Sequence, residues 1–225
     1  MAIKIDRRSS DIPYDEHGFA MTELLPGTYE GGIRNFRCSL KAGSQYSPAL
    51  YKDKTVILFF GMGRGYVIDE KDAYNIEELS FYVPEFDKTP YTVHAAEDME
   101  FVLSVVEMNQ WDWEVYNASH ARLPFFRPIS KCSVYDQSCK GPKTSSWNVL
   151  QGKQLGRIMI GAVRAVGDGT REKGHKAVHQ WNYCVGDSDF HLKVGDQPAV
   201  DHKAGDWSFI PAGPDHALVA DPGKE

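Results

Sequence analysis

The chain has 225 residues, enough for one large domain or two small ones. Its composition, 42% hydrophobic and 25% charged residues, is typical of a globular protein and excludes a disordered one. A formal net charge of -6 provides no basic surface for nucleic acid or acidic membranes, so we expect neither as a partner.

The hydrophobic segments exclude a helical membrane protein. The longest apolar runs, among them residues 56–60 and 158–163, have the length of strands and are too short to span a bilayer. Residues 1–16 lack the apolar core of a secretory signal, so we expect a cytoplasmic protein. The cysteines are scattered without CxxC spacing and are expected to be reduced thiols: Cys38, Cys132, Cys139 and Cys184.

The predicted elements are short strands rich in Val, Ile, Phe and Tyr, separated by turns of Gly, Pro, Asn and Asp. In chain order we expect strands at residues 55–60, 65–69, 78–83, 101–107, 156–166, 182–185, 190–194 and 206–210. No helical periodicity of useful length is present. The pattern therefore favours an all-β sandwich or barrel over alternating βαβ units.

Two strand-rich blocks with a similar order of events follow one another along the chain. In each, a strand ends in a Gly-containing turn, another strand follows, and a segment with Pro two or three residues after Phe comes next, at residues 81–86 and 209–216. This similarity suggests duplication of one β unit. We therefore expect a first domain at residues 18–127, a polar linker at 128–155 and a second domain at 156–225.

The most specific motif is GDWSFIPAGPDH, residues 205–216. A Gly-Asp turn enters a half-buried strand, Pro and Gly end it, and a histidine begins the next strand. This segment resembles the second motif of the cupin superfamily, G-D-x-x-x-I-P-x-G-x-x-H. The matching residues are Gly205, Asp206, Ile210, Pro211, Gly213 and His216. With its two blocks the chain resembles a bicupin, and this implies two double-stranded β-helix (jelly-roll) barrels, the N-terminal one degenerate.

The resemblance also implies a metal site in the second domain. Cupins commonly bind metal through three histidines and a glutamate, and the family's first motif corresponds to residues 169–187 here. On that correspondence we expect His175, His179 and His216 as ligands of a divalent transition metal: Mn, Fe, Ni or Zn.

The first motif departs from the family pattern in two ways. Ala177 stands where the usual H-x-H pair has its second histidine, and the glutamate position falls on His179 or Gln180, depending on a one-residue gap. In an extended segment these two side chains point to opposite faces, so only one can reach the metal. We favour His179, because imidazole is a better metal ligand than an amide, and consider Glu172 a further carboxylate candidate.

The first domain lacks the ligand histidines. Tyr46, Pro48 and Tyr51 stand where ligands would be, and its second motif contains only His94. We therefore expect a metal-free structural cupin domain there.

The function implied is that of a metal-dependent bicupin enzyme of isomerase, lyase or hydrolase type. Its substrate would be a small polar, anionic metabolite, a carboxylate or sugar-acid-like compound, bound to the metal as a Lewis acid. Tyr183 and His191 are the expected proton-transfer groups.

The alternatives are a non-catalytic small-ligand-binding or sensing bicupin, which the missing H-x-H favours, and an iron-dependent dioxygenase. A purely structural barrel has little reason to keep three such histidines.

The last segment bears on assembly. Residues 217–225 leave little chain for the strands that complete a cupin barrel, so we expect either that this end is truncated or that another strand completes the sheet. Cupins commonly exchange N-terminal strands between subunits, and the resemblance therefore implies a homodimer.

Overall fold

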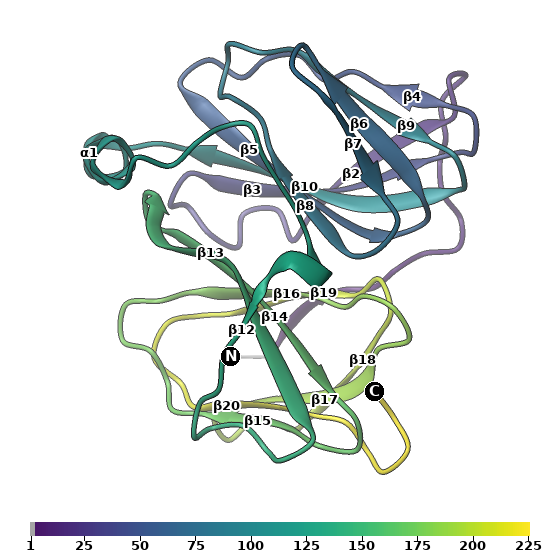
Figure 1. Cartoon of the computed structure of the whole chain (residues 1–225). Coiled ribbons are helices and arrows are strands. Elements are labelled where there is room, and N and C mark those ends of the chain that lie inside the picture. The colour runs from purple at the N-terminus through teal and green to yellow at the C-terminus, as the bar shows by residue number, and fades with distance from the viewer. Residues whose placement is uncertain (1–2) are drawn as a thin grey trace. The chain divides into compact units, whose positions relative to one another are not determined.

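The computed structural model describes residues 3–225 and consists mainly of short strands (Figure 1). In chain order the elements are β1 (Lys4–Asp6), β2 (Phe19–Leu24), β3 (Ile33–Leu40), β4 (Gln45–Tyr46), β5 (Lys54–Met62), β6 (Gly65–Asp69), β7 (Ala73–Ile76), β8 (Ser80–Val83), β9 (Tyr91–Ala95), β10 (Met99–Glu107), α1 (Gln110–Ser119), β11 (Phe125–Pro128), the short 3-10 helix η1 (Ile129–Lys131), β12 (Ser133–Val134), β13 (Thr144–Leu155), β14 (Ile158–Ala165), β15 (Gly169–Glu172), β16 (Gln180–Tyr183), β17 (Asp189–Val194), β18 (Val200–Lys203), β19 (Trp207–Ile210) and β20 (His216–Val219). Every strand predicted from the sequence overlaps one of these.

The chain folds into two compact units with boundaries that the sequence does not reveal. Unit 1 contains the chain up to Ser9, Ser133–Asn148 and Gly161–Glu225; unit 2 contains Ser10–Cys132 and Val149–Ile160. The boundaries predicted at 18–127, 128–155 and 156–225 differ from this division. In particular, the predicted linker contains β12 and the twelve-residue strand β13. Strand β13 is rich in Ser, Gln and other polar residues, and its buried and exposed positions do not alternate regularly. For this reason the sequence pattern does not predict a strand there.

Unit 2 is built from two antiparallel sheets around an apolar core. One sheet has the strand order β11-β8-β5-β10-β3-β2, and the other has the order β4-β9-β6-β7. Buried residues of both sheets belong to one cluster, including Leu58 and Phe101 from the first and Val67 and Val93 from the second. The two sheets therefore face each other across this core, as in a jelly roll.

Helix α1 in unit 2 corrects the expectation that the chain has no helix. Asn109 caps its first turn: the Asn109 side chain accepts a hydrogen bond from the Asp112 amide, and the Asp112 carboxylate accepts one from the Asn109 amide. Asp112 is the only buried residue of the helix. The helix thus depends on its cap and on a buried polar contact, and it has none of the apolar periodicity by which a helix is recognised in a sequence.

Unit 1 carries the sheets β15-β20-β17-β18 and β1-β19-β16. Along β17 the side chains alternate, so that Leu192 and Val194 are buried together with Ile210 of β19, with Leu218 packed against them. We call the faces of the strands that carry these residues the interior face of unit 1.

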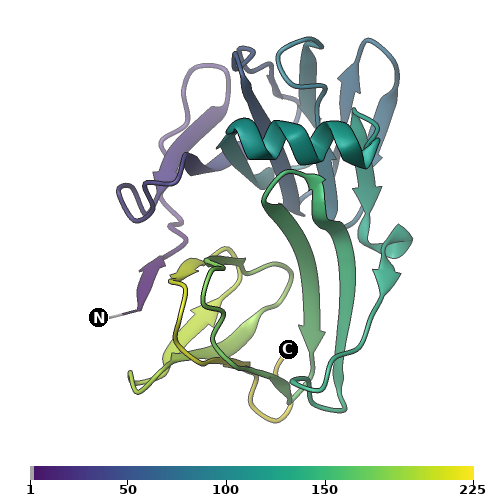
Figure 2. The same ribbon diagram turned by 90° about the vertical axis from the view of Figure 1, so that its left-hand side faces the viewer.

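The N-terminal strand β1 pairs with β19 of the same chain, with Ile5 opposite Ser208 (Figure 2). The Arg7 guanidinium donates a 2.6 Å hydrogen bond to the buried carboxylate of Asp206. Gly205 has a φ of +83°, and a side chain there would overlap Arg8. The Gly-Asp pair of the second motif therefore holds the N-terminal strand in place. A homodimer stays a prediction.

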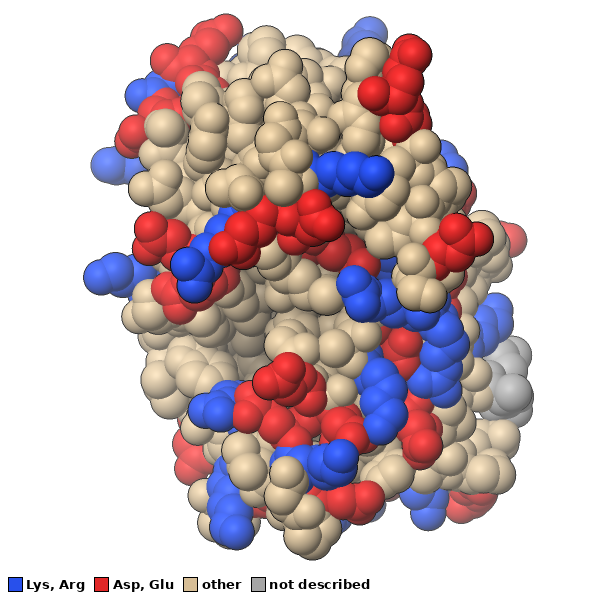
Figure 3. Space-filling view, turned by 90° about the vertical axis from the view of Figure 1, so that its right-hand side faces the viewer, with Lys and Arg blue, Asp and Glu red and all other residues tan. Residues whose placement is uncertain are grey.

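Within the part of the chain that the structure describes, no helix could span a bilayer; α1, with ten residues, is the longest. Acidic and basic side chains lie intermixed on the face drawn in Figure 3, without a large patch of one sign.

Candidate metal centre

Two neighbouring strands of unit 1 place a carboxylate beside an imidazole. Strands β15 and β20 are antiparallel, and Glu172 stands directly opposite His216. On its other side His216 stands opposite Val194 of β17. Because residues that oppose each other in an antiparallel pair share a face, Glu172 and His216 both lie on the interior face.

The loop after β15 brings His175 to the same place. The Gly174 amide donates a 2.9 Å hydrogen bond to the Asp215 carboxylate, and the Gly213 amide donates a 3.0 Å hydrogen bond to the His175 carbonyl. Position 174 requires glycine, because a Cβ there would lie 1.8 Å from the Gly213 carbonyl oxygen. The close contact of these two loops sets His175 next to His216.

The potential ligand atoms of these three residues lie within 4.8 Å of one another. The Glu172 Oε2 atom is 3.2 Å from His175 Nε2 and 3.7 Å from His216 Nε2. The His216 side chain is 2% exposed, that of Glu172 is 22% exposed and that of His175 is 44% exposed. The group is therefore buried at one end and open to solvent at the other.

This donor set fits a transition metal. Two imidazoles and a carboxylate are ordinary ligands of such ions, which hold them at about 2.0–2.2 Å. Neighbouring ligand atoms around an ion at that distance stand about 3.0–3.5 Å apart, close to the 3.2 and 3.7 Å that separate Glu172 Oε2 from the two imidazoles. One ion can therefore contact all three residues with small side-chain adjustments.

The electrostatics of the group are those of a charged pair. The nearby His216 imidazole lowers the pKa of the Glu172 carboxyl, against the opposing effect of burial. The Glu172 carboxylate in turn raises the pKa of His216, again against burial. The two shifts stabilise the charged forms of both groups, and a metal ion bound through His216 would compete with a proton for that imidazole.

The two alternatives for the fourth ligand lie in different surroundings. Gln180 stands opposite Ile210 and hence on the interior face, where its amide donates to the Asn182 side chain. His179 accepts a 3.3 Å hydrogen bond at Nδ1 from the Ala212 amide and stacks on the Phe209 ring. Neither belongs to the group of three. Their participation in metal binding stays a prediction.

The structure does not bring the two predicted proton-transfer residues to this group. Tyr183 stands opposite Trp207, one position out of phase with Ser208 and Ile210, and therefore on the other face of the sheet.

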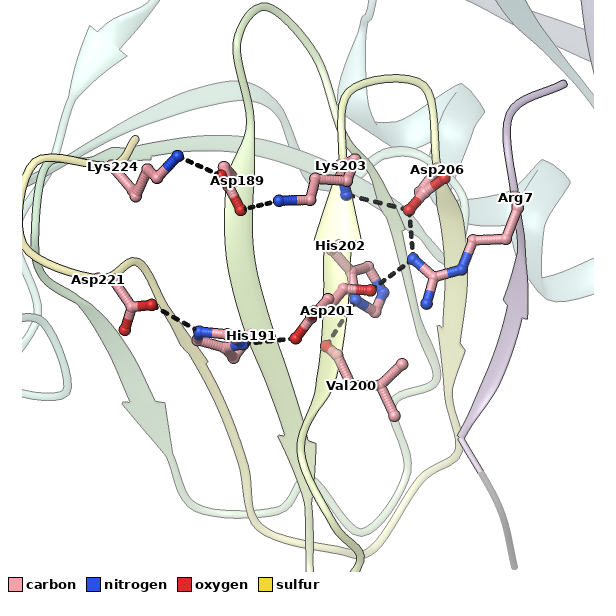
Figure 4. A network of polar contacts seen from close by, with 10 residues as sticks. All are labelled: Arg7, Asp189, His191, Val200, Asp201, His202, Lys203, Asp206, Asp221 and Lys224. Atoms are coloured by element: carbon pink, nitrogen blue, oxygen red, sulfur yellow. Dashed lines mark hydrogen bonds and ion pairs between the residues drawn. The ribbon is translucent and has the colours of Figure 1, made fainter. Parts of the chain in front are cut away.

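His191 likewise alternates with the buried Leu192 and lies on the outer face of β17. Its imidazole lies between the carboxylates of Asp201, at 2.8 Å, and Asp221, at 3.0 Å (Figure 4). These two carboxylates raise the pKa of His191. The period of two along a strand is the physical reason for both placements.

Sequence reasoning missed two residues near the group, Tyr135 and Lys140, because both lie in the predicted linker. The carboxylate of Glu172 raises the pKa of Tyr135 in addition to the larger effect of burial. The same carboxylate raises the pKa of Lys140, against the larger, lowering effect of burial. No local pattern marks these positions, since a strand some thirty residues further along the chain brings them to the site.

In unit 2, His94 stacks on the Tyr66 ring with centroids 4.6 Å apart. The absence of a metal from this unit stays a prediction.

Comparisons with known proteins show similarity at the level of the fold. No known protein-family profile matches the chain, and no curated protein matches it. Among solved structures, a protein of Pseudomonas aeruginosa described as glyoxylate-induced aligns with a TM-score of 0.70 at 15% identity, over 95% of this chain and 79% of that one. A formate complex of Lactobacillus farciminis oxalate decarboxylase aligns with a TM-score of 0.65 at 13% identity, over 97% and 85% of the two chains. A mutant of Bacillus subtilis oxalate decarboxylase has a TM-score of 0.65 at 14% identity, over 96% and 73%. The expected all-β jelly-roll fold is confirmed.

Proposed function

We propose that this chain is a cupin of two jelly-roll units, whose unit 1 binds a divalent transition metal and acts on a small anionic metabolite. The proposed ligands are Glu172, His175 and His216. The observation that carries the proposal is the convergence of their ligand atoms within 4.8 Å at the interior face.

The substrate class has support from the similar structures. Their names refer to oxalate, formate and glyoxylate, all small carboxylates. A metal held by a single carboxylate keeps a net positive charge, which attracts such anions.

The ligands differ in what they contribute. His216 is buried and is held by the β15–β20 register, so it fixes the position of an ion. His175 lies on a loop at the exposed end of the group, so substrate enters from its side. A bound ion supplies Lewis-acid polarisation of a substrate oxygen, and isomerase, lyase and hydrolase reactions all use this.

A second candidate function, an iron-dependent dioxygenase, is favoured by the composition of the ligand group. Two histidines and one carboxylate with open positions are the ligand set of non-haem iron oxygenases. A third, a non-catalytic binding or sensing protein, is favoured by the placement of Tyr183 and His191 away from the interior face. Metal identity and turnover of small carboxylates separate these functions.

The test is metal content by elemental analysis of protein purified without chelator. We expect about one transition-metal ion per chain in the wild type. Glu172→Gln and His216→Ala should lose it because each removes a ligand. The matched control is His191→Gln, on the outer face of β17, which should keep it. A wild type without metal, or full retention in both ligand variants, contradicts the proposed site.

A further inference from the structure

Lys140 is joined to the strand that carries Glu172. It forms an antiparallel bridge with Thr170. The flanking hydrogen bonds run from the Arg171 amide to the Cys139 carbonyl at 2.8 Å and from the Gly141 amide to the Gly169 carbonyl at 2.9 Å. Lys140 and Thr170 are thus a non-hydrogen-bonded pair, the closer kind, with both side chains on one face.

That face is the interior face. Thr170 and Glu172 are two residues apart on β15, so their side chains point the same way. Thr170 is 3% exposed and stands opposite Leu218, which packs with the apolar interior. The register therefore places the Lys140 side chain on the side of the sheet that carries Glu172 and His216.

The end of the Lys140 side chain is buried without a polar partner. Its Nζ atom lies 3.5 Å from the centre of the Tyr135 ring, and among residues 3–225 no atom hydrogen-bonds to it. The ring provides a cation–π contact but no acceptor. A buried ammonium that lacks an acceptor is unfavourable, so a bound anion would stabilise it.

The surrounding charges agree with a site for an anion. Burial lowers the pKa of Lys140, while Cys139, Asp136 and the Glu172 carboxylate have the opposite, smaller effect. Asp136 is exposed and thus screened by solvent. A divalent ion at the site and the Lys140 ammonium would both be positive, and the Glu172 carboxylate would cancel only one of their charges. Two positive charges would then remain uncompensated. A dianion neutralises this excess, whereas a monoanion leaves one charge uncompensated.

We propose that Lys140 is a specificity-determining residue of the metal site and binds one carboxylate of a small dicarboxylate whose other end binds the metal. This inference rests on the proposed function. It adds a residue from the segment between the two strand-rich blocks and narrows the substrate class from anions to dianions.

The test is calorimetric titration of the metal-loaded protein with malonate, and with acetate as the monoanion. Lys140→Met keeps an apolar chain against Tyr135 but removes the charge. We expect it to bind malonate roughly 10- to 100-fold more weakly than the wild type, because one charge-assisted contact is lost. Acetate binding should change by less than about threefold, and Lys140→Arg should restore part of the malonate affinity.

The matched control is Lys143→Met, which removes an exposed lysine of the same segment and should leave malonate binding unchanged. Metal content is measured on every sample, so that a wild type without metal is recognised as failure of the proposed metal site itself. With metal present, two results overturn the role of Lys140: equal malonate affinity in wild type and Lys140→Met, or a wild type that binds malonate no better than acetate. A lower melting temperature of Lys140→Met with unchanged malonate affinity shows a packing role only and also overturns it.

Discussion

His202 shows how burial controls the charge of a single residue in unit 1. The residue is 0% exposed, and its ring stacks on Phe190 with centroids 5.2 Å apart. Its Nδ1 atom lies 3.1 Å from the Val200 carbonyl oxygen (Figure 4), which matches a neutral ring that donates from Nδ1. Burial, the largest influence, lowers the pKa of His202. The folded protein therefore keeps this imidazole neutral.

The lowered pKa of His202 predicts acid destabilisation. In the unfolded chain the residue takes up a proton below its ordinary pKa of 6.5, and in the folded chain only at lower pH. The free energy of unfolding is therefore not reduced by His202 above pH 6.5, and it decreases as the pH falls below that value. We expect the melting temperature of His202→Phe to decrease less steeply between pH 7.5 and 5.5 than that of the wild type.

The control is His17→Gln, whose histidine side chain is 77% exposed and should leave the slope unchanged. Equal slopes for wild type and His202→Phe would show that His202 does not contribute to the pH dependence.

At the scale of elements, the site depends on the contact between the loop after β15 and the turn before β20. Gly174 and Gly213 meet there, and the hydrogen bond from the Gly213 amide holds the His175 backbone. Neither glycine can bind a metal through a side chain, yet their contact sets the distance between His175 and His216.

Gly174→Ala tests this dependence. The new Cβ would lie 1.8 Å from the Gly213 carbonyl oxygen, so one loop has to move and His175 with it. We expect the metal dissociation constant to rise by about tenfold or more, a shift of the size that misplaced supporting residues cause around metal ligands. Competition with a chromophoric chelator measures the constant.

Gly152→Ala is the matched control, because a Cβ at Gly152 meets nothing within 4 Å. Equal metal affinity in Gly174→Ala and wild type would contradict the proposed role of the loop contact.

The sequence predicts the positions of the strands better than it predicts which residues of different strands contact one another. Runs rich in Val, Ile, Phe and Tyr between turn residues identify segments such as β5 and β17, and the second motif correctly marks a turn, a strand and His216 at the start of the next strand. Spacing along the first motif leaves His179 and Gln180 as alternatives, and ligand chemistry favours His179, which stays a prediction. The register of β15 against β20 sets Glu172 opposite His216. The spacing of residues within one motif does not show how two strands pair.

Elements stabilised by polar or distant contacts could not be predicted. Helix α1 has an asparagine cap and a buried aspartate in place of an apolar stripe. Lys140 is placed on the side of β15 that carries Glu172 by a bridge to Thr170, which is distant in sequence. The helix lacks the apolar periodicity that marks a helix in a sequence, and the bridge of Lys140 lies outside any local window.

At the scale of the whole molecule, both units contain antiparallel sheets, but the chemistry of their residues differs. Unit 2 has the larger described apolar core, with Tyr82, Phe60 and Phe101 buried in it. Unit 1 has a small core cluster of Leu192, Val194 and Ile210, and carries the three potential ligands. Because β1 pairs with β19, unit 1 also needs the N-terminal residues to complete a sheet. The proposed metal chemistry therefore belongs to unit 1.

Anomalous diffraction from crystals of protein purified without chelator is the direct test for a metal ion in unit 1. Data collected above and below the absorption edges of Mn, Fe, Ni and Zn both locate and identify an ion. We expect one anomalous peak per chain, within about 2.0–2.3 Å of Glu172 Oε2, His175 Nε2 and His216 Nε2. A crystal with no peak at these three atoms, or with its metal bound in unit 2, would contradict this expectation.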